Sequence, residues 1–297
     1  MASRLTPERA GSVARALAMP ARSLRVQAVG GGDSCQSSLL ISGRQAVFVK
    51  TCPVEDEGML AAEADGLAAL AKTGSVRVPG VLGRGLFDDA AGSWLALEAL
   101  DLRPRSHEVD ARLGVELAQL HGRTGQQFGW HCANFIGRMP QANRQYANWT
   151  AFFLEQRLLP QCRQLLKSDP ERKLNPLISR LIEAWKSTSN NHHPEPALLH
   201  GDLWAGNAAA LPDATPVIFD PAVHYGDREC DLAMADLFGG FSEVFFSAYQ
   251  QAWPLPDGWQ QRRGFYQLYH WLNHANLFGG SYRAGLEARM RVLIGSC

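Results

Sequence analysis

The sequence predicts an α+β protein with a small β-rich N-terminal lobe, residues 1–100, and a larger, mostly helical lobe, residues 101–297. Alternating apolar runs and glycine-rich turns fill the first hundred residues, which is typical of strands. Most later segments show the 3.6-residue apolar period of helices. The simplest architecture for this order is two lobes joined near Leu100 to Arg103.

The N-terminal strands are expected where apolar residues alternate between turns. One helix should interrupt them, because an Ala- and Leu-rich segment separates the third run from the fourth. The expected strands are 24–29, 37–42, 46–50, 78–87 and 93–100, and the expected helix is 55–72.

Beyond residue 108 the apolar period predicts helices, except where residues 198–207 and a Pro-Asp turn break it. That turn predicts a hairpin over residues 208–220. The expected helices are 109–122, 149–167, 174–187, 231–239 and 259–278.

The composition is that of an ordinary globular protein: 297 residues, 46% hydrophobic, 20% charged and a net charge of zero. Zero net charge gives no electrostatic argument for nucleic acid or an anionic membrane as partner. Residues 1–20 lack the apolar region of a signal peptide, and no run approaches the roughly 18 apolar residues of a membrane span.

The six cysteines are scattered without a CxxC pair, so neither a disulfide framework nor a zinc site is expected. We expect a soluble protein of the reducing cytoplasm.

The segment His200–Asn207, HGDLWAGN, is the strongest functional signal. Asp202 follows His200 by two residues, Asn207 follows Asp202 by five, and Asp220 lies beyond the predicted hairpin. This is the spacing of a kinase catalytic loop and its metal-binding aspartate. His-x-Asp alone is common and usually structural, but the full set predicts phosphoryl transfer from ATP.

Each of these side chains suits a role in that reaction. The Asp202 carboxylate would accept the proton of the attacking hydroxyl, or orient that hydroxyl. Asn207 and Asp220 offer the hard oxygen ligands that Mg²⁺ prefers. Asn207 after Gly206 also suits a left-handed turn, and the two roles are compatible.

A second group of residues predicts nucleotide binding in the N-terminal lobe. The turn Gly30–Ser34 lets backbone N–H groups approach phosphates, although most such turns merely connect strands. Lys50 ends a strand, where a kinase lysine pairs the α- and β-phosphates. We favour Glu63 over Glu57 as its ion-pair partner, because Glu63 lies in Ala-rich helical surroundings. The predicted cofactor contacts of this group are Gly31, Gly32, Asp33, Ser34, Lys50 and Glu63.

Three further features have weaker signals. The segment from Glu98 to Leu100 leaves a strand where backbone groups would bind adenine, although a strand leaving the core looks the same. Asp231 is expected to accept hydrogen bonds that brace the catalytic loop, with His200 as a second supporting residue. Cys35 has no neighbouring base in the sequence, so an inert side chain is favoured over a redox-sensitive one.

With these residues in place, the sequence resembles the fructosamine/ketosamine-3-kinase family, a branch of the protein-kinase-like superfamily near the aminoglycoside and choline phosphotransferases. The most specific matches are LLHGDLWAGN (198–207) and FDPAVHYGDRECDLAMADLFGGF (219–241), supported by FGWHCANFIG (128–137). Asp220 is followed by Pro221 in place of Phe-Gly, unlike ordinary protein kinases. The loop Asp33-Ser34-Cys35 departs from many relatives, so a redox switch described for some members is not assumed.

The resemblance implies a protein-kinase-like fold and ATP- and Mg²⁺-dependent phosphorylation of the sugar 3-hydroxyl of ketoamines. The acceptors would be small-molecule ketoamines or glycated protein lysines, with deglycation as the outcome. It also implies Trp204 and His274 as candidates for the sugar pocket, because an aromatic face and an imidazole suit a polyol.

Two alternatives stay open. The first alternative to a ketoamine kinase is a kinase of the same fold for another hydroxyl, on an amino sugar, choline or an aminoglycoside. The second is a nucleotide-binding pseudokinase. Retention of Lys50, Asp202, Asn207 and Asp220 together argues against the pseudokinase.

Overall fold

The structure, a computed structural model, describes residues 4–20, 23–30, 35–169 and 173–295. The chain folds into two compact units. Unit 1 comprises Met1–Val109 and Ala208–Pro221, and unit 2 comprises Asp110–Asn207 and Ala222–Cys297. Unit 1 thus contains a late segment of the chain in addition to the N-terminal residues.

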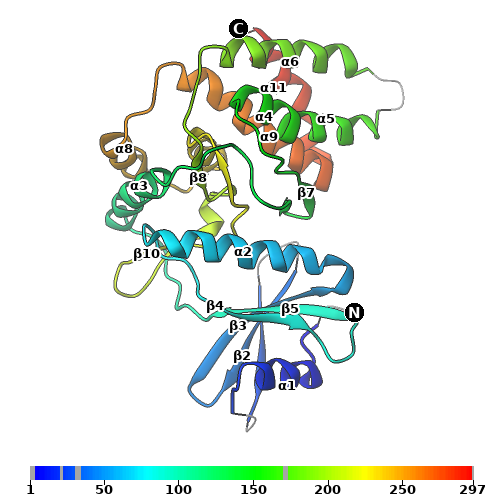
Figure 1. Ribbon diagram of the computed structural model, residues 1–297, viewed down its shortest axis with the longest axis vertical. Coiled ribbons are helices and arrows are strands. Elements are labelled where there is room, and N and C mark those ends of the chain that lie inside the picture. The colour runs from blue at the N-terminus through cyan, green and yellow to red at the C-terminus, as the bar shows by residue number, and fades with distance from the viewer. Residues whose placement is uncertain (1–3, 21–22, 31–34, 170–172, 296–297) are drawn as a thin grey trace. The chain divides into compact units, whose positions relative to one another are not determined.

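Unit 1 is built on a five-stranded antiparallel sheet with the order β1-β2-β3-β5-β4. Gly43, at φ +60°, allows the tight turn between β2 and β3. In Figure 1, α2 runs along one face of this sheet and α1 lies against the other. The elements are α1 (Pro7–Ala16), β1 (Arg25–Val29), β2 (Gln36–Ser42), β3 (Gln45–Pro53), η1 (Val54–Asp56), α2 (Glu57–Thr73), β4 (Val81–Leu86) and β5 (Gly92–Glu98).

The late segment adds the predicted hairpin to unit 1. Strands β9 (Ala208–Ala210) and β10 (Pro216–Ile218) pair antiparallel, with Ala208 opposite Ile218. Arg103 bridges to Ala210 and Arg77 bridges to Val217, so backbone hydrogen bonds join the hairpin to the N-terminal part of the unit. The hairpin ends two residues before Asp220 and thereby places that residue in unit 1.

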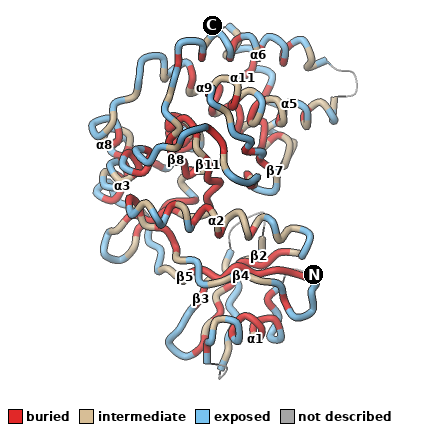
Figure 2. Tube along the Cα trace, in the orientation of Figure 1, coloured by how far each residue is buried: buried red, intermediate tan, exposed pale blue. Residues whose placement is uncertain are grey.

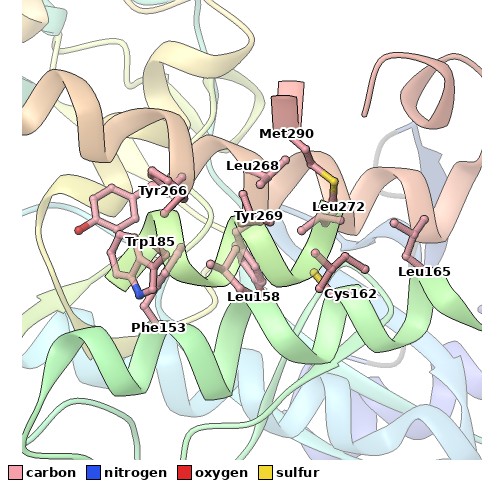
Figure 3. Close-up of a cluster of buried hydrophobic side chains, with 14 of the residues drawn as sticks. Phe153, Leu158, Cys162, Leu165, Trp185, Tyr266, Leu268, Tyr269, Leu272 and Met290 are labelled. Atoms are coloured by element: carbon pink, nitrogen blue, oxygen red, sulfur yellow. The ribbon is translucent and has the colours of Figure 1, made fainter. Parts of the chain in front are cut away.

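Unit 2 is mainly helical around the long helix α9, whose inner face carries aromatic residues. Phe153, Trp185 and Tyr266 pack together in its core, as Figure 3 shows. The helices are α3 (His107–His121), α4 (Trp149–Phe153), α5 (Leu159–Leu166), α6 (Asn175–Ser189), α7 (Glu229–Leu237), α8 (Glu243–Ala252), α9 (Trp259–Phe278), α10 (Gly280–Ala284) and α11 (Leu286–Gly295). Short segments complete it: β6 (Asn134–Ile136), β7 (Met139–Gln141), η2 (Leu154–Leu158), β8 (Ala197–Leu199), η3 (Ala205–Asn207) and β11 (His224–Gly226).

The single helix predicted over residues 149–167 is wrong in one respect, because a π-helical turn, η2, separates α4 from α5. Pro160, near the start of α5, has no N–H to donate to the carbonyl four residues earlier, and its ring crowds that carbonyl. A wider turn before the proline relieves the conflict.

Two buried strands lead into segments that hold candidate site residues: β5 ends at Glu98, and β8 ends just before His200. Figure 2 shows β5 and β8 as buried stretches, one in each unit.

None of the helices in the described part of the chain combines the length and apolar character needed to cross a lipid bilayer.

Two buried histidines of unit 2 predict a loss of stability in acid. Burial and the charge of Arg157 lower the pKa of His224 to about 3, and burial and His274 lower the pKa of His270 to about 3. At a pH below about 6.5, the ordinary pKa of histidine, the unfolded chain therefore binds protons that the folded chain does not. The free energy of unfolding consequently decreases as the pH is lowered. The expected slope is about 1.4 kcal/mol per pH unit for each histidine.

Thermal unfolding measured between pH 7 and pH 5 checks this slope. Replacing buried His270 by Phe should make the slope shallower, whereas replacing exposed His193 by Gln should leave it unchanged. Equal slopes in all three proteins would contradict the assignment.

Candidate active site

The backbone that leads into Asp202 is held by the Asp231 carboxylate of α7. Asp231 accepts hydrogen bonds from the backbone N–H of His200, at 2.7 Å, and of Gly201, at 2.8 Å. Burial opposes ionisation of Asp231, but its hydrogen bonds, led by the one from His121, outweigh this and lower its pKa. Asp231 therefore braces the predicted catalytic loop as an ionised acceptor.

A residue that sequence reasoning missed orients this carboxylate. His121 Nε2 lies 3.1 Å from Asp231 Oδ2, and His121 Nδ1 lies 2.8 Å from the Tyr249 hydroxyl. An ionised carboxylate only accepts, so Nε2 donates to Asp231. His121 ends α3 more than a hundred positions from Asp231, and nothing in its local sequence marks it.

Gly201 is required by the path of the loop. Its φ is +83°, and a Cβ there would lie 2.1 Å from the Ala222 carbonyl oxygen. The Ala222 N–H donates to the His200 carbonyl at 2.8 Å, so the loop segments around these two residues pass close to each other. Only glycine fits both the conformation and the space.

Asp202 and Asn207 lie together across the turn η3. The buried Asn207 donates from Nδ2 to the Asp202 carbonyl, at 2.9 Å, and to Asp202 Oδ2, at 3.3 Å. With its nitrogen turned to Asp202, the Asn207 amide oxygen is the atom suited to a metal. His200 is fully buried, and its Nδ1 accepts from the Asp202 N–H at 3.3 Å, as expected of a supporting residue.

The two residues proposed for the sugar pocket are placed differently. Trp204 is 41% exposed, and its ring lies where a Cβ on Gly206 would approach within 2.2 Å, so the indole folds back over that glycine. His274 is half-buried on α9, and its Nδ1 bonds the His270 carbonyl. Its ring contacts Phe238 at a centroid distance of 5.1 Å and Tyr282 at 5.0 Å. Their contact with sugar stays a prediction.

In unit 1, buried Lys50 forms ion pairs with two carboxylates. Its Nζ lies 2.7 Å from Glu63 Oε1 and 2.6 Å from Asp220 Oδ1. Glu63 is thus the helical partner that the sequence favoured, whereas Glu57 pairs with Arg84 at 2.7 Å. Burial opposes the Lys50 charge, but Glu63 and Asp220 outweigh it and raise its pKa.

These three groups include two carboxylates but only one cation. Burial, with Asp220 nearby, raises the pKa of Glu63 to about 7, although Lys50 opposes the shift. Whenever Glu63 is ionised, the cluster carries one more negative than positive charge, which a divalent cation bound by Asp220 would neutralise. The Asp220 carboxylate in unit 1 thus suits the role of metal ligand that the sequence predicts for it.

Asp220 has an unusual backbone conformation for a residue other than glycine, with φ +58°. Asp tolerates the left-handed region better than most residues, and strain of this kind clusters at functional sites. No pattern in the sequence predicted this conformation.

The remaining predicted nucleotide contacts are only partly described. Gly31, Gly32, Asp33 and Ser34 lie outside the described residues. The Glu98 backbone N–H, expected to be available to adenine, donates to the Gly80 carbonyl at 2.8 Å. The Glu98 carboxylate meanwhile binds Arg77 at 2.5 Å. The Glu98 N–H is therefore not available to adenine, and adenine binding by the Glu98 carbonyl or by backbone groups near Leu100 stays a prediction.

Comparison with solved structures shows the fold. A chain described as a putative fructosamine-3-kinase from Haemophilus somnus superposes with a TM-score of 0.86 at 30% identity, covering 95% of this chain and 96% of that one. Choline kinase LicA from Streptococcus pneumoniae superposes with a TM-score of 0.61 at 14% identity, covering 93% and 95% of the two chains. The chain therefore has the α+β, protein-kinase-like fold predicted from its sequence.

Sequence comparison shows the family. A probable ketoamine kinase from Synechocystis is 41% identical over 95% of this chain and 94% of its own length. Ketosamine-3-kinase from Mus musculus is 36% identical over 89% and 93%. The fructosamine kinase family matches residues 8–295. With that match along almost its whole length, this chain belongs to the fructosamine kinase family.

Proposed function

We propose that this phosphotransferase transfers the γ-phosphoryl group of Mg²⁺-ATP to the sugar 3-hydroxyl of ketoamines of the fructosamine or ribulosamine type. The observation that carries the proposal is the family match over residues 8–295, which includes the Asp202–Asn207 turn. Relatives are named ketosamine-3-kinase in Mus musculus and protein-ribulosamine 3-kinase in Arabidopsis thaliana. We infer the same range of acceptors here, on small amines or protein lysines, with deglycation as the outcome.

In this reaction Asp202 acts as the base. Its Oδ2 already accepts from Asn207, which fixes the carboxylate, and Asp231 fixes the backbone just before it. A carboxylate held in this way orients the acceptor hydroxyl and takes its proton as the phosphoryl group moves.

Asn207 and Asp220 would hold Mg²⁺, and Lys50 would bind the α- and β-phosphates. When bound, Mg²⁺ neutralises the charge that develops on the transferring phosphoryl group. Asp220 supplies a carboxylate oxygen and Asn207 an amide oxygen, the ligand types that Mg²⁺ prefers. Glu63 keeps the Lys50 ammonium in place through its 2.7 Å ion pair.

Replacing Lys50 by Met should weaken the use of ATP. A hydrogen bond to a charged group contributes about 1.5–3 kcal/mol, so kcat/KM for ATP should fall roughly 10- to 150-fold. Steady-state kinetics with varied Mg²⁺-ATP measure the effect. The control is Glu57→Gln, which breaks only the exposed pair with Arg84 and should leave kcat/KM near the wild-type value. A folded Lys50→Met protein with unchanged kcat/KM would exclude Lys50 from nucleotide binding.

A panel of acceptors tests the substrate class. We expect turnover with ribulosamine, erythrulosamine or fructosamine, and their kcat/KM ratios report how well each transition state is bound. Turnover only with an amino sugar, choline or an aminoglycoside would replace the ketoamine proposal with the alternative phosphotransferase. ATP binding without turnover of any acceptor would favour the pseudokinase.

We further propose that the protein works in the cytoplasm on these small or protein-bound ketoamines, without a nucleic acid or membrane partner. The five cysteines in the described part of the chain are free thiols, which suits a reducing compartment.

A further inference from the structure

Arg157, in the π-helical turn η2, is a buried cation of unit 2 whose hydrogen-bond partners are neutral. It is 2% exposed. It donates to the Ala142 carbonyl at 2.6 Å, to the Gln156 carbonyl at 3.0 Å and to Asn143 Oδ1 at 2.7 Å, and the described residues give it no carboxylate partner. Burial lowers the pKa of Arg157 to about 10, so the guanidinium is still charged at neutral pH. Arginine is almost never fully buried unless it is paired with an acid, so this side chain is expected to do more than pack.

Arg157 fixes the direction of the hydrogen bonds around it, because a guanidinium only donates. Since Asn143 accepts from Arg157 through Oδ1, its Nδ2 group must donate, and it does so to Asn134 Oδ1 at 2.9 Å. Asn134 Oδ1 also accepts from Gln141 Nε2 at 2.8 Å, which leaves Gln141 Oε1 to accept from the Tyr269 hydroxyl at 2.6 Å. One cation therefore sets the orientation of three buried amides, those of Asn134, Gln141 and Asn143.

The remaining end of the Asn134 amide holds the backbone beside the catalytic turn. With Oδ1 accepting twice, Asn134 Nδ2 donates to the Val223 carbonyl at 2.8 Å. The residue before Val223 is Ala222, whose carbonyl oxygen lies where a Cβ on Gly201 would approach within 2.1 Å. The network thus ends one residue from the backbone that packs against Gly201, directly before Asp202.

The other end of the network lies near the Asp202 side chain. Burial raises the pKa of Tyr269 to about 12, and the charge of Asp202 adds to this rise while the charge of Arg157 opposes it. The Tyr269 hydroxyl, held by Gln141, is therefore within electrostatic reach of both charged groups.

We propose that Arg157 is a positioning residue for Asp202. It orients the Asn143 and Asn134 amides, and the Asn134 amide in turn holds the Val223 carbonyl. The inference rests on the proposed function, in which Asp202 must lie correctly against the acceptor hydroxyl. A guanidinium suits this task because its donors form a rigid fork and it has no acceptor atom that would let the amides turn round.

Asn134→Asp tests the last bond of the network. The new carboxylate keeps an oxygen that accepts from Gln141 and Asn143. Its second oxygen faces the Val223 carbonyl, so a donated hydrogen bond becomes a repulsion. We expect kcat with a ketoamine acceptor to fall about 10- to 100-fold, since a misplacement of about 1 Å costs about 100-fold. The Kd for Mg²⁺-ATP, measured by calorimetry, should stay unchanged.

The matched control is the same substitution at the exposed N-cap of α4. In Asn148→Asp the oxygen that caps the helix is retained, so full activity is expected. A folded Asn134→Asp protein with the kcat of this control would overturn the proposal.

Arg157→Met removes the group that orients the network and should lower kcat to a similar extent. Because Arg157 is proposed to act through Asn134, the double variant should lose little more than the larger of the two single losses. Additive losses would show that Arg157 acts by another route and would overturn the proposal. If Arg157→Met does not fold, the comparison of Asn134→Asp with Asn148→Asp still decides.

Hydrogen exchange separates this inference from the proposed function, because it requires no substrate. Amide exchange followed by mass spectrometry should be faster in residues 200–203 and 222–224 of the Asn134→Asp protein than in the wild type. A wild-type chain that phosphorylates no ketoamine would contradict the proposed function, and exchange would still test the network. Unchanged exchange in these two segments would contradict the role of Asn134 in holding the turn.

Discussion

Replacing Asp202 by Asn should lower kcat roughly 10²- to 10⁴-fold, the usual contribution of a positioned general base. Asn keeps the shape of the side chain but cannot take a proton. Asn207 still has the Asp202 backbone carbonyl to bond, at 2.9 Å in the native chain, so the turn should persist. The loss should therefore appear in kcat, with the Kd for Mg²⁺-ATP nearly unchanged.

Stopped-flow or steady-state assays with a ketoamine acceptor measure kcat, and calorimetry measures nucleotide affinity. Asp257→Asn, at an exposed acid in the same unit, is the matched control and should retain full activity. A folded Asp202→Asn protein with wild-type kcat would show that this carboxylate is not the base.

Replacing Gly201 by Ala should cost about 2–5 kcal/mol of folding stability. The left-handed conformation, φ +83°, costs an alanine about 1–2 kcal/mol. The new Cβ would also meet the Ala222 carbonyl oxygen at 2.1 Å, and overpacking of this kind adds about 1–3 kcal/mol. Because Asp202 is the next residue, the displaced backbone should reduce activity as well.

Gly239→Ala separates the two contributions. Gly239 also has a left-handed backbone, φ +70°, but a Cβ there meets nothing within 4 Å. Urea unfolding should therefore show only the conformational cost for Gly239→Ala and the larger loss for Gly201→Ala. Equal losses in the two variants would mean that the Ala222 contact relaxes and that the loop is not tightly constrained.

Local patterns were enough to predict much of the fold. Alternating residues predicted the strands around Lys50, and the Pro-Asp turn predicted the hairpin that precedes Asp220. The pairing of Lys50 with Glu63 was predicted from the place of the kinase lysine at a strand end and from the Ala-rich helical surroundings of Glu63. The spacing of HGDLWAGN gave Asp202 and Asn207 as neighbours because they lie within one turn.

Features that depend on distant parts of the chain were not predictable in the same way. His121 contacts Asp231 across 110 positions, and a lone histidine carries no signal of such a partner. The Asp220 conformation, φ +58°, arises from the structure around it.

The most direct test of the proposed function is the position of the phosphate in the product. The chain is incubated with Mg²⁺-ATP and a fructosamine or ribulosamine, and the product is examined by ³¹P–¹H correlation NMR, with the Asp202→Asn protein as the blank. We predict a phosphate coupled to the proton on sugar carbon 3, formed by the wild-type chain and not by the variant. A phosphate on another hydroxyl, or transfer to no ketoamine at all, would contradict it.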